Sequence, residues 1–185
     1  SELQEEKSRG YDLGLSWQAA GGLYLEAVYF DQPIEGEIYF DLADYSGYLQ
    51  ASGNTDSSGV ELSADWPLLA QLSLSANNTF NNTRTSDGNS RAYRPEHLAN
   101  LGVNWRPLSG RRVLGLAWRL SRDAEDFDGA ELDDYQLLEL NASYEVLAGL
   151  QIFGRLENAL DEDYQEVPTY NTSGAAGYAG LRYSF

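Results

Sequence analysis

Few residues in this chain of 185 are suited to acid, base or metal chemistry. There is no Cys, and His97 is the single histidine, which excludes thiol catalysis and any site that needs two imidazoles. A catalytic His needs a nucleophile or a paired acid beside it, and the sequence offers His97 no such partner. His97 precedes an expected strand, so we interpret it as a histidine at the rim of a sheet and expect no enzyme activity.

Carboxylates gather in two stretches of the chain. Residues 123–134 contain seven Asp and Glu side chains, whose hard oxygens are the ligands that Ca²⁺ prefers. An EF-hand alignment fails, because Ala124 and Tyr135 occupy the first and twelfth ligand positions. A solvated acidic loop is therefore the favoured interpretation, Ca²⁺ binding stays open, and no cofactor or other metal site is expected. The second stretch, Asp161–Glu166, precedes Tyr170 and Asn171.

The charge balance limits the class of partner. With 12 basic and 29 acidic residues the chain carries a formal charge of −17, whereas binding to phosphates requires clustered Lys and Arg. We therefore expect no nucleic acid partner. Aromatic residues make up 12 % of the chain, which argues against disorder.

Apolar and polar residues alternate with a period of two in nine segments, each with one apolar and one polar face, as in β-strands. No amphipathic helix is available to cover the apolar faces. The sequence therefore predicts an all-β, antiparallel fold. The segments are residues 11–17, 23–29, 60–66, 72–80, 99–105, 114–120, 138–144, 150–156 and 179–185.

The links between these segments alternate in length. Short links follow the first, third, fifth and seventh segments, and long links are expected at about 31–56, 82–96, 122–133 and 160–175. Short turns at one rim and long loops at the other are typical of transmembrane β-barrels of the outer membrane. A soluble β-sandwich is the alternative, but it has no reason to sort its loops in this way.

Aromatic side chains mark the expected membrane boundary. Rings prefer the interface between membrane and water, where they form belts around a barrel. We expect such a belt beside the short turns, and we expect outer-membrane lipid and lipopolysaccharide as partners of the barrel. Its predicted members are Trp17, Trp66, Trp105, Tyr144 and Phe185.

Nine strands do not close an up-and-down antiparallel barrel, and open edges are not stable in lipid. We therefore expect residues 1–185 to be the C-terminal portion of a larger transmembrane β-barrel domain.

Several motifs resemble those of TonB-dependent outer-membrane receptors. Residues 6–14 are similar to an early strand motif of that family, with Asp12 in place of its usual Glu. Residues 94–97 resemble the proline-containing start of a late strand, and residues 158–164 resemble the Asn-Leu-Phe-Asp-x-x-Tyr motif, with Leu160 in place of Phe. The terminal Tyr-Ser-Phe resembles the signal that the barrel assembly machinery reads. Spacing and loop lengths are most similar to the cobalamin receptor branch.

The resemblance implies the last nine strands of a 22-stranded bacterial outer-membrane barrel. It also implies an N-terminal plug domain, absent from this chain, that contacts TonB. Active transport of a scarce bulky ligand is the implied function, with cobalamin or another corrinoid as the expected ligand. A siderophore receptor, a structural or adhesive barrel and an enzyme barrel are the alternatives, of which the last is disfavoured by the single His97.

Two sets of candidate site residues follow. In the resembled family the last outer loop can touch substrate, so we expect Tyr170 to lay its ring on a flat ligand and Asn171 to hydrogen-bond amide groups. Charged side chains on the polar faces are expected to line the lumen and grip the plug. These are Arg106, Arg119, Glu139, Glu145, Arg155, Glu157 and Arg182.

Overall fold

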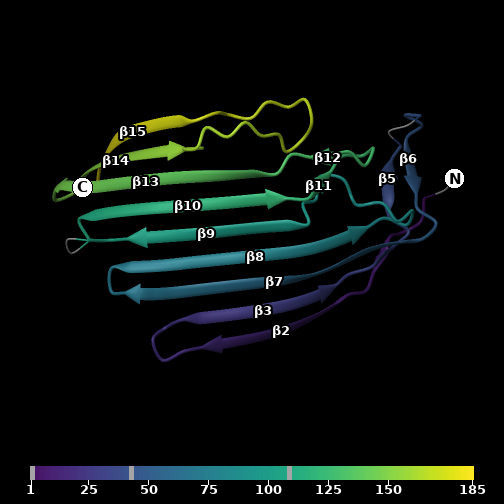
Figure 1. Ribbon diagram of the computed structural model, residues 1–185, viewed down its shortest axis with the longest axis horizontal. Coiled ribbons are helices and arrows are strands. Elements are labelled where there is room, and N and C mark those ends of the chain that lie inside the picture. Colours follow the sequence, from purple (N-terminus) through teal and green to yellow (C-terminus); the bar gives the residue numbers. More distant parts are fainter. Residues whose placement is uncertain (1–2, 42–43, 108–109) are drawn as a thin grey trace.

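The computed structural model describes residues 3–41, 44–107 and 110–185. Its main element is one large curved antiparallel sheet, in which each long strand pairs with its neighbour in the chain (Figure 1). Nine long strands form it in the described part of the chain. They are β2 (Tyr11–Gln18), β3 (Tyr24–Asp31), β7 (Asn54–Leu69), β8 (Leu72–Arg84), β9 (His97–Trp105), β10 (Arg112–Arg122), β13 (Tyr135–Leu147), β14 (Leu150–Glu157) and β15 (Ala176–Tyr183).

The connections sort by length as the sequence predicts. Short turns join β2 to β3, β7 to β8, β9 to β10 and β13 to β14 at one end, where the chain also finishes (Figure 1). Long connections lie at the opposite end, where the described chain begins. Glycine allows the tight turn at Gly149, whose φ is +80°.

Six short strands that the alternation does not reveal occur in the described residues, five in the long connections and one, β1 (Lys7–Ser8), before β2. β5 (Ile38–Phe40) and β6 (Tyr48–Gln50) form one hairpin, and β11 (Ala124–Glu125) and β12 (Glu131–Leu132) form another. β1 pairs with β4 (Ile34–Glu35), and β4 in turn pairs with the beginning of β7. The long-loop end is thus a structured region built from β-hairpins.

Two polar stretches expected as loops continue two strands. β7 already begins at Asn54 and β8 runs to Arg84, with Asp56 opposite Arg84. Ser57, Asn81 and Thr83 hydrogen-bond to one another across this extension. The prediction of a long link at residues 54–56 and 82–84 is therefore wrong, because backbone pairing continues where the strands no longer need an apolar face.

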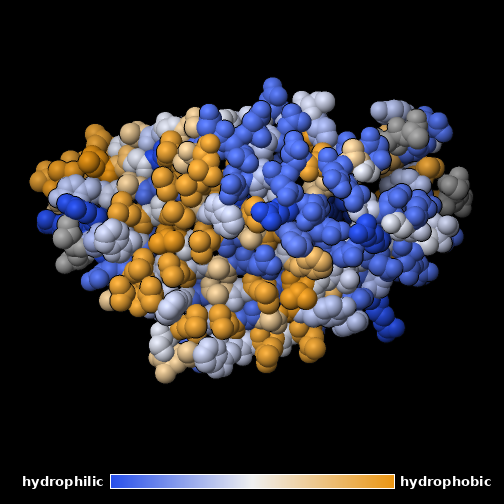
Figure 2. Space-filling view, viewed as in Figure 1, coloured by the Kyte–Doolittle hydropathy of each residue, from blue (hydrophilic) through white to orange (hydrophobic). Residues whose placement is uncertain are grey.

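The sheet has no dry interior. Within the described residues, Tyr135 is the one buried hydrophobic side chain, while Leu62, Leu140 and Leu181 are exposed on the apolar face. A soluble sandwich would pack these leucines between its sheets. Figure 2 shows hydrophobic side chains gathered over the strands toward the short-turn end, and mainly hydrophilic ones at the long-loop end.

The predicted aromatic belt residues stand at the short-turn rim. Trp105 ends β9, and Tyr144 lies under the Arg112 guanidinium at the start of β10, with 5.4 Å between the guanidinium carbon and the ring centre. β15 ends at Tyr183, two residues before the predicted end of the last strand, so Phe185 lies beyond it and is fully exposed. Trp17, Trp66 and Trp105 are also exposed. Their contact with lipid remains a prediction.

Candidate functional site

Six of the seven charged residues predicted to line a lumen lie on strands at the polar face of the sheet, and Arg106 lies just after the end of β9. Arg155 forms an ion pair with Glu157 at 3.0 Å and places its guanidinium 4.8 Å from the ring centre of Tyr178. Arg182 lies 5.4 Å from the ring centre of Phe153 and donates a 3.3 Å hydrogen bond to Gln151. Each of these arginines thus lies near an aromatic ring on the same face of the sheet.

The remaining predicted charges are less connected. Arg106 donates to the side chain of Asn104 at 3.0 Å, and Glu145 accepts a 3.4 Å bond from the backbone of Gly149. Glu139 lies opposite Ala117 and is exposed. Across the described residues, Arg155 with Glu157 is the one ion pair formed inside the predicted set. Contact of these side chains with a plug remains a prediction.

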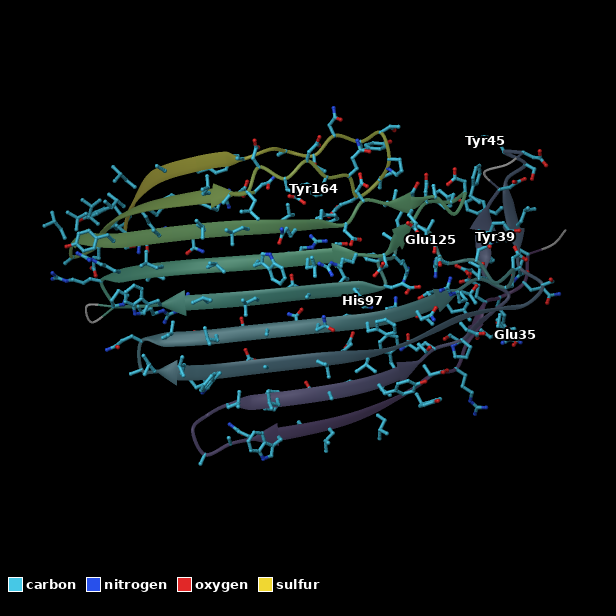
Figure 3. All side chains as sticks on the ribbon, in the orientation of Figure 1. Glu35, Tyr39, Tyr45, His97, Glu125 and Tyr164 are labelled. Carbon is cyan, nitrogen blue, oxygen red and sulfur yellow. The ribbon has the colours of Figure 1, made fainter. Side chains whose placement is uncertain are left out.

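Arg119 belongs to a polar cluster that sequence reasoning did not assemble. The side chains of Arg119, Tyr135 and Glu166 meet pairwise: Arg119 lies 3.3 Å from both partners, and the Tyr135 hydroxyl donates to Glu166 at 3.1 Å. Tyr164 packs on Tyr135, with 4.6 Å between ring centres. Figure 3 shows Tyr164 in the connection between β14 and β15, which folds back to the sheet.

This cluster borders a cavity of about 280 Å³ near the long-loop end. The wall is shared by the segment before β9, by β10, by the region from β11 to the start of β13 and by the loop after β14. Alternation identifies Arg119 as a residue of the polar face, but no local signal brings Glu166 to it. The polar side chains that line the cavity include Arg119, Ser121, Arg122, Asp133, Tyr135 and Glu166.

Side-chain contacts tie the long loops to one another. Glu37, which is buried, forms a 2.7 Å ion pair with Arg91 and also accepts a hydrogen bond from Thr55. Ser90 donates to Glu125 at 2.7 Å, and Tyr93 donates to Asp126. The connections before β7, before β9 and before β13 therefore form one linked region.

The Tyr93 contact makes a prediction about pH. Its hydrogen bond to Asp126 raises the pKa of Tyr93 from 10.0 to about 12, with a smaller contribution from burial. The neutral hydroxyl is the stabilised form, so the contact is expected to persist at pH 10 and to be lost as the pH rises through about 12. An absorbance titration of tyrosinate should lose one late-ionising residue in Tyr93→Phe. Loss of an early-ionising residue instead would contradict the assignment.

The motif at residues 158–164 forms a clamp at the base of the last long loop. Asn158 is 6 % exposed, and its side-chain amide donates to the carbonyls of Glu162 at 2.9 Å and Ser173 at 3.1 Å. Its side-chain oxygen accepts from the backbone of Glu162 at 2.9 Å. Asp161 accepts from the backbone of Ala175 at 2.8 Å. The two side chains thus join the beginning of the loop to its end.

The predicted ligand-contacting residues Tyr170 and Asn171 lie in this clamped loop. Both side chains are exposed, and Tyr170 is 71 % accessible. They do not line the cavity beside Arg119. Their accessibility leaves them available to a ligand, and their role remains a prediction.

The acidic loop does not gather a metal site. Its carboxylates are used locally: Asp128 accepts from the backbone of Ala130 at 3.0 Å, and Asp134 lies 3.7 Å from Arg122. No group of three or more His, Cys, Asp or Glu side chains suited to a metal ion occurs among residues 3–41, 44–107 and 110–185. In the same ranges, no helix is long and apolar enough to cross a membrane.

A curved antiparallel sheet with an exposed apolar face, a polar face and loops sorted by length defines a wall segment of an outer-membrane β-barrel. The chain belongs to the family described as "TonB dependent receptor-like, beta-barrel", which it matches over residues 1–159. The family resemblance seen in the motifs is thereby confirmed, and the chain is placed in the bacterial outer membrane.

Among curated relatives, the chain is 24 % identical over 180 residues to a vitamin B12 transporter, BtuB, of Vibrio cholerae. The match covers 93 % of this chain and 27 % of that protein. A BtuB of Photobacterium profundum is 40 % identical over 55 residues, 30 % of this chain and 9 % of the relative. The chain therefore spans about a quarter of the length of the relative that it matches along most of its sequence.

Solved structures of outer-membrane receptors share the fold. A copper transporter, OprC, superposes with a TM-score of 0.81 at 20 % identity, over 100 % of this chain and 32 % of that one. The ferripyoverdine receptor of Pseudomonas aeruginosa gives 0.82 at 16 % identity, over 100 % and 28 %. Identities this low establish the fold alone.

Proposed function

We propose that this chain is the C-terminal wall of a TonB-dependent transporter that imports a corrinoid such as cobalamin. In the complete protein, about 22 strands would close the barrel, a plug domain would rest against the polar face, and TonB would supply energy through that plug. The barrel assembly machinery would recognise the terminal Tyr-Ser-Phe. Outer-membrane lipid and lipopolysaccharide would surround the apolar face.

The observation that carries the choice of ligand is the charge of the long loops. The segments 32–53, 85–96, 123–134 and 158–175 hold seventeen of the 29 acidic residues but only two of the 12 basic ones, Arg91 and Arg94. A strongly negative charge on the loops at the long-loop end of the barrel repels anions and lowers their rate of entry. Cyanocobalamin has no net charge, so it escapes this penalty. The 93 % coverage by a vitamin B12 transporter supports the same ligand.

A ferric siderophore is the second candidate, favoured by the likeness to the ferripyoverdine receptor. Uptake of labelled cyanocobalamin by cells that express the full-length protein distinguishes the two. We expect saturable uptake that depends on the energised inner membrane. Absence of saturable uptake, together with uptake of a ferric siderophore, would overturn the corrinoid proposal.

Tyr170 provides a residue-level test of the same proposal. A ring that stacks on a flat ligand contributes about 1 kcal/mol, so Tyr170→Ala is expected to weaken cyanocobalamin binding roughly fivefold. Tyr45→Ala is a matched control, because Tyr45 is 73 % exposed in a different long loop. Equal affinities of the wild type and Tyr170→Ala in equilibrium titrations would reject the stacking role.

A further inference from the structure

The cavity beside Arg119 is lined by charges of both signs. Arg119 and Arg122 supply cations, Glu166 and Asp133 supply carboxylates, and Tyr135 and Ser121 add neutral hydroxyl groups. The side chains of Arg119 and Glu166 are 46 % and 54 % exposed. Both charges are therefore accessible to an incoming group, and their mutual attraction is weak because it is screened by water.

The contacts within the cluster leave bonding capacity on both charged side chains. In the part of the chain that the structure describes, Arg119 uses only Nη2 and Glu166 uses only Oε1 for side-chain hydrogen bonds, and the guanidinium carbon of Arg119 lies 5.9 Å from the ring centre of Tyr135. A guanidinium has five N–H donors, and a carboxylate has two acceptor oxygens. Donors of Arg119 and the second oxygen of Glu166 thus remain for a ligand, a few ångströms apart.

We propose that this cavity binds a neutral carboxamide substituent of the transported ligand. A carboxamide carries one acceptor oxygen and two N–H donors, which match the guanidinium of Arg119 and the carboxylate of Glu166 at the same time. A carboxylate in that position would face Glu166 and Asp133, and an ammonium would face Arg119 and Arg122. Each charged alternative therefore meets a like charge, whereas the neutral amide satisfies both sides.

The size of the cavity agrees with a substituent rather than a whole ligand. Pockets that enclose a complete small molecule usually measure roughly 300–1,000 Å³, and this one is about 280 Å³. A corrin ring carries several carboxamide side chains at its edge, so one can enter while the ring stays in the mouth of the barrel. This assignment rests on the corrinoid proposal. It adds Arg119 and Glu166 as ligand contacts to the residues already proposed, Tyr170 and Asn171.

The test compares cyanocobalamin with its isomeric monocarboxylates, in each of which one carboxamide has been hydrolysed. Titrations of the full-length wild type are expected to show at least one isomer that binds about tenfold or more weaker than cyanocobalamin, because a hydrogen bond to a charged group is lost and a like-charge contact is gained. In Glu166→Gln, cyanocobalamin should bind only about threefold more tightly than that isomer, or less.

Glu131→Gln is the control for net charge. Glu131 is exposed in the neighbouring acidic loop and does not line the cavity, so this variant should keep the wild-type ratio. If the wild type binds cyanocobalamin and all its monocarboxylates equally well, the assignment of the cavity is overturned but the proposed function is not. The same holds if Glu166→Gln leaves the ratio of the affinities for cyanocobalamin and the isomer unchanged. A wild type that binds no corrinoid would overturn the proposed function, and this assignment with it.

Discussion

Leu116→Arg is expected to abolish stable assembly of the full-length protein in the outer membrane. Leu116 lies on the apolar face of β10, between Val103 on β9 and Leu140 on β13. Arginine on the lipid face of a barrel costs about 2–4 kcal/mol near the middle of the membrane. A loss of this size is a large fraction of the stability of a folded protein. We expect most of the variant to lose the compact, heat-modifiable form on gels and to leave the outer-membrane fraction.

Ala117→Arg is the matched control for this effect. Ala117 is the next residue of β10, so its side chain points to the polar face, where Glu139 lies opposite. An arginine at this position stays hydrated beside a carboxylate. The Ala117→Arg variant is therefore expected to assemble nearly as well as the wild type. Equal loss in both variants would show that the two faces do not differ in solvent, and would contradict the barrel interpretation.

The strands were predictable from the sequence because the two faces of the sheet have different solvents. Lipid on one side and water on the other require a change of polarity at every residue, and segments such as 114–120 therefore alternate clearly. The pairing within β2–β3, β7–β8, β9–β10 and β13–β14 follows from the short turns that join these strands. The nine predicted segments all fall within strands, apart from residue 23 and the last two residues of the chain.

The alternation fails where both faces of a strand carry polar side chains, as in the extensions that contain the buried Thr55 and Thr83. Residues 54–59 and 81–84 extend β7 and β8, yet their Asn, Ser and Thr side chains are also typical of loops. No apolar face is required there, so hydrophobic patterning carries no information about the backbone. The ladder continues because backbone groups and the hydrogen bond between Ser57 and Thr83 stabilise it.

The cluster at Arg119 was not predictable for a different reason. Glu166 is 47 residues from Arg119 in the sequence, and the two meet because the loop after β14 folds back onto the sheet. Sequence reasoning treated Glu166 as part of an acidic stretch and Arg119 as one of several lumen charges. Contacts between distant loops depend on the shape of those loops, which residue spacing does not determine.

The motif at residues 158–164 was recognised by resemblance, and its physical role appears only in the structure. Asn158 and Asp161 have φ values of +45° and +52°, a region in which Asn and Asp are favoured over most residues other than glycine. Both side chains then hydrogen-bond to the backbone of the loop. The motif therefore specifies a turn and closes the loop that carries Tyr170.

Asn158→Ala is expected to release this loop. The substitution removes three hydrogen bonds at a residue that is 6 % exposed, and leaves two carbonyls and one N–H without their partner. At about 0.5–1.5 kcal/mol for each bond, the local free energy of opening should fall by about 2–4 kcal/mol. Limited proteolysis of the full-length protein in the membrane should cleave residues 158–175 at least tenfold faster, while the strands stay protected.

Asn158→Gly and Asn158→Asp separate the causes of that effect. Glycine adopts the positive φ without strain but lacks the side chain, so rapid cleavage should remain. Aspartate keeps the acceptor for the backbone of Glu162 and loses the two donated bonds, and it should be intermediate. If glycine restored protection, backbone conformation alone would hold the loop. If all three variants resisted protease like the wild type, Asn158 would not close the loop.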